Sequence, residues 1–239
     1  MRFLIYGAGV IGCFYGALLS ERGYDVTIYA RGSRLESLNR LGLRYKSGRV
    51  VRRARVRVIS QVGNSDCYDF VFLAVRENQL HAALYELRGN ASPTIVTMVN
   101  SLESYEEWEA ICGRGRILPA FPGAGGGFEK DCLDAALTPR IVQPTTYGEI
   151  DGRKSRRMEQ LAGVFRKCRI PYRIVSDMHT WQLCHLAMVV PIADAYYEAE
   201  NPAEAGCDWN IMCRTARRIK RNFRAIKTQV EDFQKRGRE

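Results

Sequence analysis

The sequence predicts a doubly wound α/β fold with a parallel sheet, followed by a short helical region. An apolar strand, a glycine-rich turn and a helix open the chain, and strand and helix patterns then alternate to about residue 176. Beyond Asp177 the pattern is purely helical. We therefore expect two domains, an α/β domain over residues 1–176 and an all-helical domain over residues 177–239.

The turn after the first strand has the spacing of a dinucleotide-binding site of the Rossmann type. In such a turn the first glycine makes the tight bend, the second lets the pyrophosphate approach the backbone, and the third lets the helix pack against the strand. The pyrophosphate then lies at the helix N-terminus, where free N–H groups attract anions. The candidate cofactor-binding residues of this turn are Gly7, Gly9, Val10, Ile11 and Gly12. A turn that merely packs would not need three glycines at these spacings.

The residues after the second expected strand, at positions 25–29, indicate which dinucleotide binds. NAD sites carry an acid about 20 residues after the glycines to bind the ribose 2′-OH, whereas an arginine there accommodates a 2′-phosphate. This chain has Arg31, Ser33 and Arg34 at that point, and its next acid is Glu36. We therefore expect NADP(H) as the cofactor. In the alternative interpretation, both arginines are ordinary solvated charges.

Two later apolar runs, at positions 70–75 and 94–99, are continuous rather than alternating. Strands covered on both faces by helices have this pattern. Between them, residues 78–87 have the spacing of a helix with its leucines on one side. These segments extend the parallel sheet.

The net charge of +10 comes from two segments. Residues 44–57 carry seven Lys or Arg and no acid, and residues 214–239 carry ten against three acids, which leaves −4 for the remainder. Over positions 53–58, arginines alternate with apolar residues, which predicts one strand with a solvated face, preceded by a hairpin turn at Ser47 and Gly48. We do not expect nucleic-acid binding, because this strip lacks interleaved aromatic residues; RNA contact is the alternative.

Two helices are expected in the C-terminal region. Asp177 is a candidate N-cap for a helix that runs through Trp181 and His185 to Pro191, and its apolar character from Leu183 onward predicts burial on all sides.

The second helix carries apolar residues at alternating spacings of four and three, which is a heptad seam. The seam consists of Met212, Ala216, Ile219, Phe223, Ile226, Val230 and Phe233. A helix with such an apolar stripe is stable only when the stripe packs against another surface. That surface is either the preceding helix of the same chain or a second subunit in a homodimer. Like-charged flanks would oppose the dimer unless acids such as Glu198, Glu200 and Glu204 lie across the contact.

Composition excludes several classes of protein. The 239-residue chain is 46% hydrophobic, which is typical of globular proteins, and its N-terminal apolar run is too short for a signal peptide. No apolar stretch reaches the roughly 18 residues of a membrane span. The eight cysteines form no CxxC pair. We therefore expect a cytoplasmic protein with reduced thiols, no metal site and no membrane contact.

The chain resembles the ketopantoate reductase family, two-domain NADPH enzymes that reduce a 2-keto acid to a 2-hydroxy acid. The resemblance depends on the order and spacing of several segments: the glycine turn, Arg31-Gly32, positions 74–79, Asn100, positions 121–126, Gly148-Glu149 and the helix near Trp181. It implies that Ala74 and Gln79 contact the cofactor. It also implies that Arg76 and Asn100 line the catalytic site, Asn100 touching the cofactor as well.

The chain departs from the family pattern at several positions. The family typically has Lys where Arg76 stands and Gly where Ser101 stands, and its proton-donating Lys corresponds to Leu183 here. His185, one helical turn beyond Trp181, is the substitute donor that we consider, although a lone histidine on an apolar helix is more often a core residue.

Family members also run some 60 residues further, so we expect the helical domain to be incomplete or to be completed by another chain. We also expect little or no ketopantoate reduction by this chain alone. The alternative function is a non-catalytic NADP(H)-binding or sensor protein. The identity of the small keto-acid substrate is not readable from the sequence.

Overall fold

The computed structural model describes residues 1–199, 201 and 204–236, with the backbone alone described over 229–236. The chain forms two compact units, Met1–Met178 and His179–Glu239, which are considered in turn.

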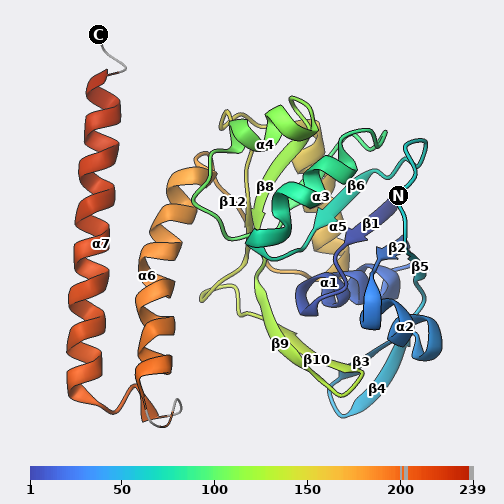
Figure 1. The fold of residues 1–239 in the computed structure, drawn as a ribbon, viewed down its shortest axis with the longest axis horizontal. Coiled ribbons are helices and arrows are strands. Elements are labelled where there is room, and N and C mark those ends of the chain that lie inside the picture. The colour runs from blue at the N-terminus through green and yellow to red at the C-terminus, as the bar shows by residue number, and fades with distance from the viewer. Residues whose placement is uncertain (200, 202–203, 237–239) are drawn as a thin grey trace. The chain divides into compact units, whose positions relative to one another are not determined.

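An eight-stranded sheet forms the centre of the first unit (Figure 1). Its strands are β1 (Arg2–Tyr6), β2 (Asp25–Tyr29), β5 (Arg57–Ile59), β6 (Phe70–Leu73), β7 (Ile95–Thr97), β8 (Ile117–Phe121), β11 (Thr145–Tyr147) and β12 (Tyr172–Ile174). The order across the sheet is β12-β11-β8-β7-β6-β1-β2-β5. The six strands from β8 to β5 are parallel, and β11 pairs with β8 in the antiparallel direction. The continuous apolar runs are buried along β6 and β7, as expected.

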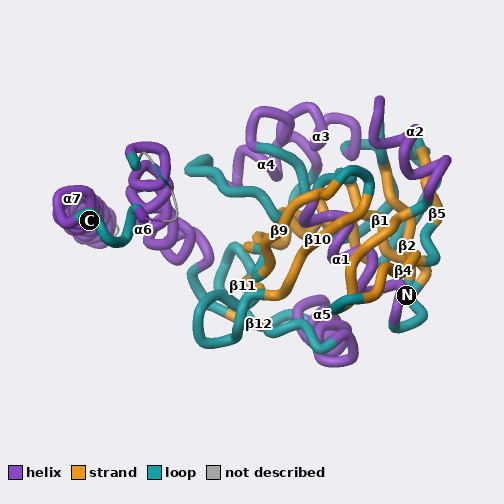
Figure 2. The backbone as a smooth tube through the Cα atoms, turned by 90° about the horizontal axis from the view of Figure 1, so that it is seen from below, coloured by secondary structure: helices purple, strands orange, loops and turns teal. Residues whose placement is uncertain are grey.

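Helices cover both faces of this sheet, which confirms the doubly wound α/β fold. They are α1 (Val10–Glu21), α2 (Gly32–Leu41), α3 (Leu80–Leu87), which follows the 3₁₀ turn Glu77–Gln79, α4 (Tyr105–Cys112) and α5 (Arg156–Cys168). Helices α3 and α4 pack together on one face, and α1 and α5 belong to the other (Figures 1 and 2).

A second, four-stranded sheet lies against the outer side of α1. It contains β3 (Leu43–Ser47), β4 (Val50–Ala54), β9 (Ala124–Glu129) and β10 (Cys132–Leu137) in the order β4-β3-β10-β9. Helix α1 contacts β1 and β2 of the large sheet and all four strands of the small one, so it is covered on two sides. Figure 2 shows β9 and β10 beside it. Sequence reasoning did not find β9 or β10. In β9, the glycines at positions 125–127 have low strand propensity.

The basic segment is a hairpin, but the single strand expected over residues 53–58 is wrong. The hairpin of β3 and β4 turns at Gly48 and Arg49, one position after the expected Ser47 and Gly48, because Ser47 is still paired with Val50. Strand β4 ends at Ala54, and β5 begins at Arg57 in the large sheet, next to β2. The alternation of exposed arginines with more buried apolar residues persists through the break. The alternation arises in two different strands, β4 of the small sheet and β5 of the large sheet. The sequence period alone does not distinguish two such strands from one continuous strand.

The second unit contains α6 (Met178–Glu198) and α7 (Trp209–Arg236). The expected end of α6 at Pro191 is wrong, since the helix continues for seven more residues. A proline inside a helix leaves the carbonyl four residues earlier without its N–H donor. That carbonyl belongs to Ala187, and it accepts a hydrogen bond from Asn222 Nδ2 of α7 at 3.2 Å. The neighbouring helix therefore satisfies the group that Pro191 leaves free.

The expectation that α6 is buried all round is also wrong. Met188, Val190 and Ile192 are 41%, 50% and 38% exposed, and Tyr197 is 90% exposed. Among the described residues, none of the helices combines the length and apolar character required to cross a membrane.

Candidate functional site

The glycine turn between β1 and α1 forms a narrow cradle. Gly7 has φ +119°, and a Cβ there would lie 2.3 Å from the carbonyl oxygen of Ala74. A Cβ on Gly12 would lie 2.0 Å from the carbonyl oxygen of Gly7, so the helix approaches the turn too closely for any side chain. A Cβ on Gly9, by contrast, would meet no atom within 4 Å. The turn is closed on the protein side and open where a ligand would approach the backbone.

Helix α1 begins directly at this open side. Gly9 is its N-cap residue, and no side chain caps the first turn. The first backbone N–H groups of a helix have no acceptor within the helix, so Val10 and Ile11 present donors at the positive end of the helix dipole. This arrangement suits a bound phosphate.

A cavity of about 270 Å³ extends from the glycine turn across the carboxyl ends of β1, β2 and β6. Its lining is Tyr6, Gly7, Ala8, Gly9, Tyr29, Ala30, Arg31, Arg34, Ala74, Val75, Arg76, Gln79 and Phe128. Seven of the residues expected from the sequence therefore share one cavity. Four others, Val10, Ile11, Gly12 and Ser33, lie beside it on the first turns of α1 and α2, outside the lining.

Asn100 follows β7, the neighbour of β6 in the sheet, so it lies at the same carboxyl edge as Arg76. Both residues are exposed, and Asn100 is not part of the cavity lining. The loops that carry them are connected by a hydrogen bond from Ser101 Oγ to Glu77 Oε1 at 2.9 Å. Ser101 thus joins the two loops.

Arg31 and Arg34 have different surroundings. The side chain of Arg31 is 55% exposed, with its guanidinium 5.5 Å from the ring centroid of Tyr29. Arg34 is more enclosed: its Nε donates to the carbonyl oxygen of Ala8 at 3.2 Å, and its guanidinium stacks 4.0 Å above the ring of Phe128. Arg31 is therefore the more available cation, while Arg34 connects the glycine turn to β9.

Glu86 of α3 also belongs to this site, and sequence reasoning missed it. Its Oε1 accepts from Arg31 Nη1 at 3.2 Å, and its Oε2 accepts from Tyr29 Oη at 2.9 Å and from Tyr6 Oη. Burial, followed by hydrogen bonding to Glu86, raises the pKa of Tyr6 and of Tyr29, so both phenols stay protonated as donors. The sequence held one signal for this part of the site, a tyrosine at the end of each of the first two strands. Tyr6 and Tyr29 are paired in register in the parallel sheet.

His185 lies in the second unit, on α6. Its ring stacks on Trp181, with the centroids 5.2 Å apart and the planes 9° from parallel. Burial lowers the pKa of His185, which favours the neutral imidazole at pH 7. The role of His185 as proton donor stays a prediction. The expectation that Leu183 cannot donate a proton in place of a lysine stays a prediction too.

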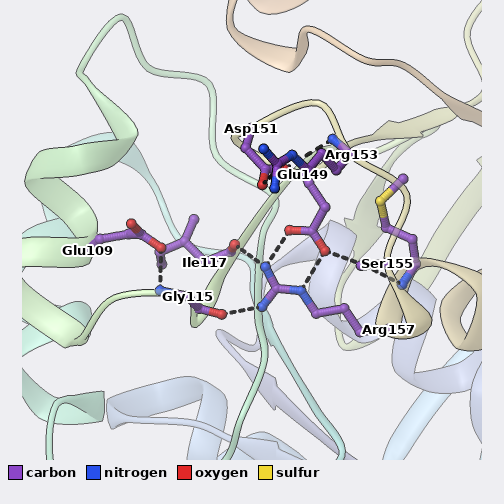
Figure 3. A network of polar contacts seen from close by, with 9 residues as sticks. Glu109, Gly115, Ile117, Glu149, Asp151, Arg153, Ser155 and Arg157 are labelled. Carbon is purple, nitrogen blue, oxygen red and sulfur yellow. Dashed lines mark hydrogen bonds and ion pairs between the residues drawn. The ribbon is translucent and has the colours of Figure 1, made fainter.

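Figure 3 shows a separate polar cluster around Arg157. Arg157 Nε and Nη2 donate to the two carboxylate oxygens of Glu149 at 2.8 and 2.5 Å, and Nη1 and Nη2 donate to the carbonyl oxygens of Gly115 and Ile117 at 2.5 and 2.9 Å. Ile117 begins β8, so the cluster lies at the amino edge of the parallel strands, opposite the glycine turn. All three guanidinium nitrogens are used within the chain, and we interpret the cluster as a connection between α5 and the sheet.

No group of three or more His, Cys, Asp or Glu residues suited to a metal ion occurs in the part of the chain that the structure describes.

Comparison with known proteins gives consistent matches. Residues 3–134 match the family model of ketopantoate reductase PanE/ApbA. The 2-dehydropantoate 2-reductase of Archaeoglobus fulgidus is 28% identical over 178 residues, which are 74% of this chain and 57% of that protein. The uncharacterized oxidoreductase YkpB of Bacillus subtilis is 27% identical over 174 residues, 69% of this chain and 54% of that one. The chain thus spans just over half the length of these curated relatives.

Solved structures share the fold. A PanE/ApbA family ketopantoate reductase from Ralstonia eutropha superposes with a TM-score of 0.74 at 15% identity, covering 96% of this chain and 75% of that one. A D-mandelate dehydrogenase in a ternary structure with NADH and anilino(oxo)acetate gives a TM-score of 0.70 at 16% identity, covering 86% and 69%.

Proposed function

The chain belongs to the ketopantoate reductase PanE/ApbA family, and we propose that it binds NADP(H) and reduces a 2-keto acid to a 2-hydroxy acid. One observation carries the proposal: the glycine turn shares a single cavity with Arg31, Arg76 and Gln79 at the carboxyl edge of the parallel strands. Open α/β sheets bind their ligands at this edge.

The residues present fit a dinucleotide. The open side of Gly9 and the uncapped first turn of α1 would hold the pyrophosphate, and Arg31 would bind the 2′-phosphate. Ala74 and Gln79 would contact the remainder of the cofactor. When bound, NADPH supplies a hydride to the carbonyl carbon of the acid.

The other residues of the site would act on the substrate. Arg76 would attract the substrate carboxylate, and the amide of Asn100 would donate a hydrogen bond to the keto oxygen. The alkoxide formed there must take up a proton, and we assign that step to His185. Because burial lowers the pKa of His185, we expect a smaller fraction of its side chain to carry the proton at neutral pH than in an ordinary histidine.

The test combines binding and turnover. NADPH binding is measured by titration, and NADPH consumption is followed with a panel of 2-keto acids that includes ketopantoate. We expect binding, consumption with at least one 2-keto acid, little with ketopantoate, and loss of the activity in His185→Gln. An absence of binding would overturn the proposal.

A second function is favoured by one observation, the apolar Leu183 at the position of the family lysine. In that case the chain would be an NADP(H)-binding or sensor protein without turnover. NADPH binding with no consumption on any member of the panel would support it, since positioned acid catalysis typically contributes 10² to 10⁴ in rate.

We also propose a cytoplasmic location and a homodimer formed through α7. Met212 and Phe223 of the seam are 46% and 40% exposed, so the seam is not closed within this chain. Val230 and Phe233 of the seam lie outside the described side chains.

A further inference from the structure

An acid lies at the end of β2 although the residues that directly follow this strand in the sequence, 30–35, include none. Tyr6 and Tyr29 are paired in register at the ends of β1 and β2, and their rings stack with centroids 4.3 Å apart. Both phenols donate to Oε2 of Glu86, and its Oε1 takes the guanidinium of Arg31. The side chain of Glu86 is 42% exposed.

The strand pattern explains how this acid arrives there. Ile5 and Ile28 face α1, where they approach Gly16, so the next residues of both strands point to the opposite face of the sheet. Helix α3 covers that face, and its Glu86 reaches the two tyrosines from a point 57 residues beyond Tyr29.

We propose that Glu86 is the residue that limits the preference of this site for a 2′-phosphorylated dinucleotide, an inference that rests on the proposed function. A carboxylate at the end of β2 is the group that NAD sites use to bind the ribose hydroxyls. Here the same group neutralises Arg31, the cation that a 2′-phosphate needs. Glu86 acts on the phosphate through Arg31 and is a positioning residue.

The size of the effect follows from exposure. Ion pairs between exposed side chains are screened by water and contribute little. We therefore expect Glu86→Gln to raise the ratio of NADPH affinity to NADH affinity about three- to fivefold. The glutamine keeps a carbonyl oxygen for the two phenols and removes only the charge. Glu107→Gln, an exposed acid on α4, is the matched control and should leave the ratio unchanged.

The experiment is a double-mutant cycle read by calorimetric titration with NADPH and with NADH. The variants are wild type, Glu86→Gln, Arg31→Ala and the combination of both. If Glu86 acts through Arg31, its substitution has less than a twofold effect on the ratio in the Arg31→Ala background. A purely structural role would weaken both dinucleotides alike and would not move the ratio.

The outcomes separate the two proposals. An unchanged NADPH to NADH ratio in Glu86→Gln, with wild type binding NADPH, overturns the role of Glu86 and leaves the proposed function standing. A rise that persists in the Arg31→Ala background also overturns it. If wild type binds neither dinucleotide, both proposals fail.

Discussion

Arg31 and Arg34 are three positions apart, but their side chains make different contacts. Arg31 is exposed and paired with Glu86, whereas Arg34 holds the carbonyl of Ala8 and stacks on Phe128. A ligand phosphate can approach Arg31 directly. It could engage Arg34 only by competing with these contacts, which connect the glycine turn to the small sheet.

This difference leads to a prediction about cofactor discrimination. Arg31→Ala should weaken NADPH about ten- to a hundredfold, because a charge-assisted phosphate contact contributes about 1.5 to 3 kcal/mol, and should leave NADH nearly unchanged. Arg34→Ala should weaken both dinucleotides by similar factors, because it loosens the turn. Titration with each dinucleotide checks both variants; equal affinities of wild type for NADPH and NADH would refute the preference.

A second residue-scale prediction concerns Glu103, which follows the Asn100 loop. The indole N–H of Trp108, at 2.7 Å, and then His81, at 2.8 Å, hold the pKa of Glu103 below its ordinary value of 4.5. A carboxyl whose pKa is lowered by folding stabilises the fold above the unfolded-state pKa, and this contribution disappears as pH falls through the folded-state pKa.

Wild type should therefore be more stable than Glu103→Gln at pH 6.5, and the difference should shrink below about pH 4.5. Urea unfolding of both proteins across this range measures it. Glu107→Gln, on the same helix as Trp108, is the control for a lost surface charge. A difference that stays constant from pH 6.5 to pH 3 would contradict the assignment.

At the scale of elements, α6 and α7 depend on each other through Pro191. The proline leaves the carbonyl of Ala187 without a helical donor, and Asn222 supplies one. Ion pairs at 3.5 Å from Arg218 to Asp194 and from Arg214 to Glu198 add to the same contact. As exposed pairs they contribute less than the hydrogen bond to an otherwise unpaired carbonyl.

We predict a coupling of about 1 kcal/mol between Pro191 and Asn222 in a double-mutant cycle. Asn222→Ala should destabilise the wild-type chain more than it destabilises the Pro191→Ala variant, in which residue 191 again donates to Ala187. Urea unfolding of the four proteins followed by circular dichroism gives the coupling. A value near zero would show that water serves the carbonyl equally well.

At the scale of the whole molecule, the open seam of α7 predicts association. Met212, Phe223 and the adjoining Trp209, which is 74% exposed, leave apolar surface along the helix. Glu198, one of the acids expected across a dimer contact, pairs instead with Arg214 and Arg218 of its own chain. Glu198 thereby neutralises part of the positive charge of α7, which reduces the repulsion between two copies of this helix.

We therefore expect a dimer at tens of micromolar in sedimentation experiments. Phe223→Glu should dissociate it without loss of NADPH binding, because a charge in the seam opposes its burial. Ala225→Glu places the same charge on an exposed position of α7 outside the seam and should leave the dimer intact. A monomeric wild type at these concentrations would end the proposal.

The local features of the fold were readable from the sequence. The glycine turn, the buried strands β6 and β7 and the β3–β4 hairpin follow from neighbouring residues, because backbone conformation and burial period are encoded within a few positions. The gathering of the glycines with Arg31, Arg76 and Gln79 also follows, since parallel strands bring their carboxyl ends to one edge.

Only the tertiary structure decided the rest, because it depends on pairing between remote segments. The glycine-rich strand β9 forms because β10 pairs with it, and α6 passes Pro191 because Asn222 of another helix meets the freed carbonyl. Glu86 reaches Arg31 from 55 residues away, so no spacing rule placed an acid at the end of β2. The sequence by itself determined a Rossmann-type sheet with a glycine turn after its first strand, whereas the carboxylate beside Arg31 came from a helix packed on the opposite face of the sheet from α1.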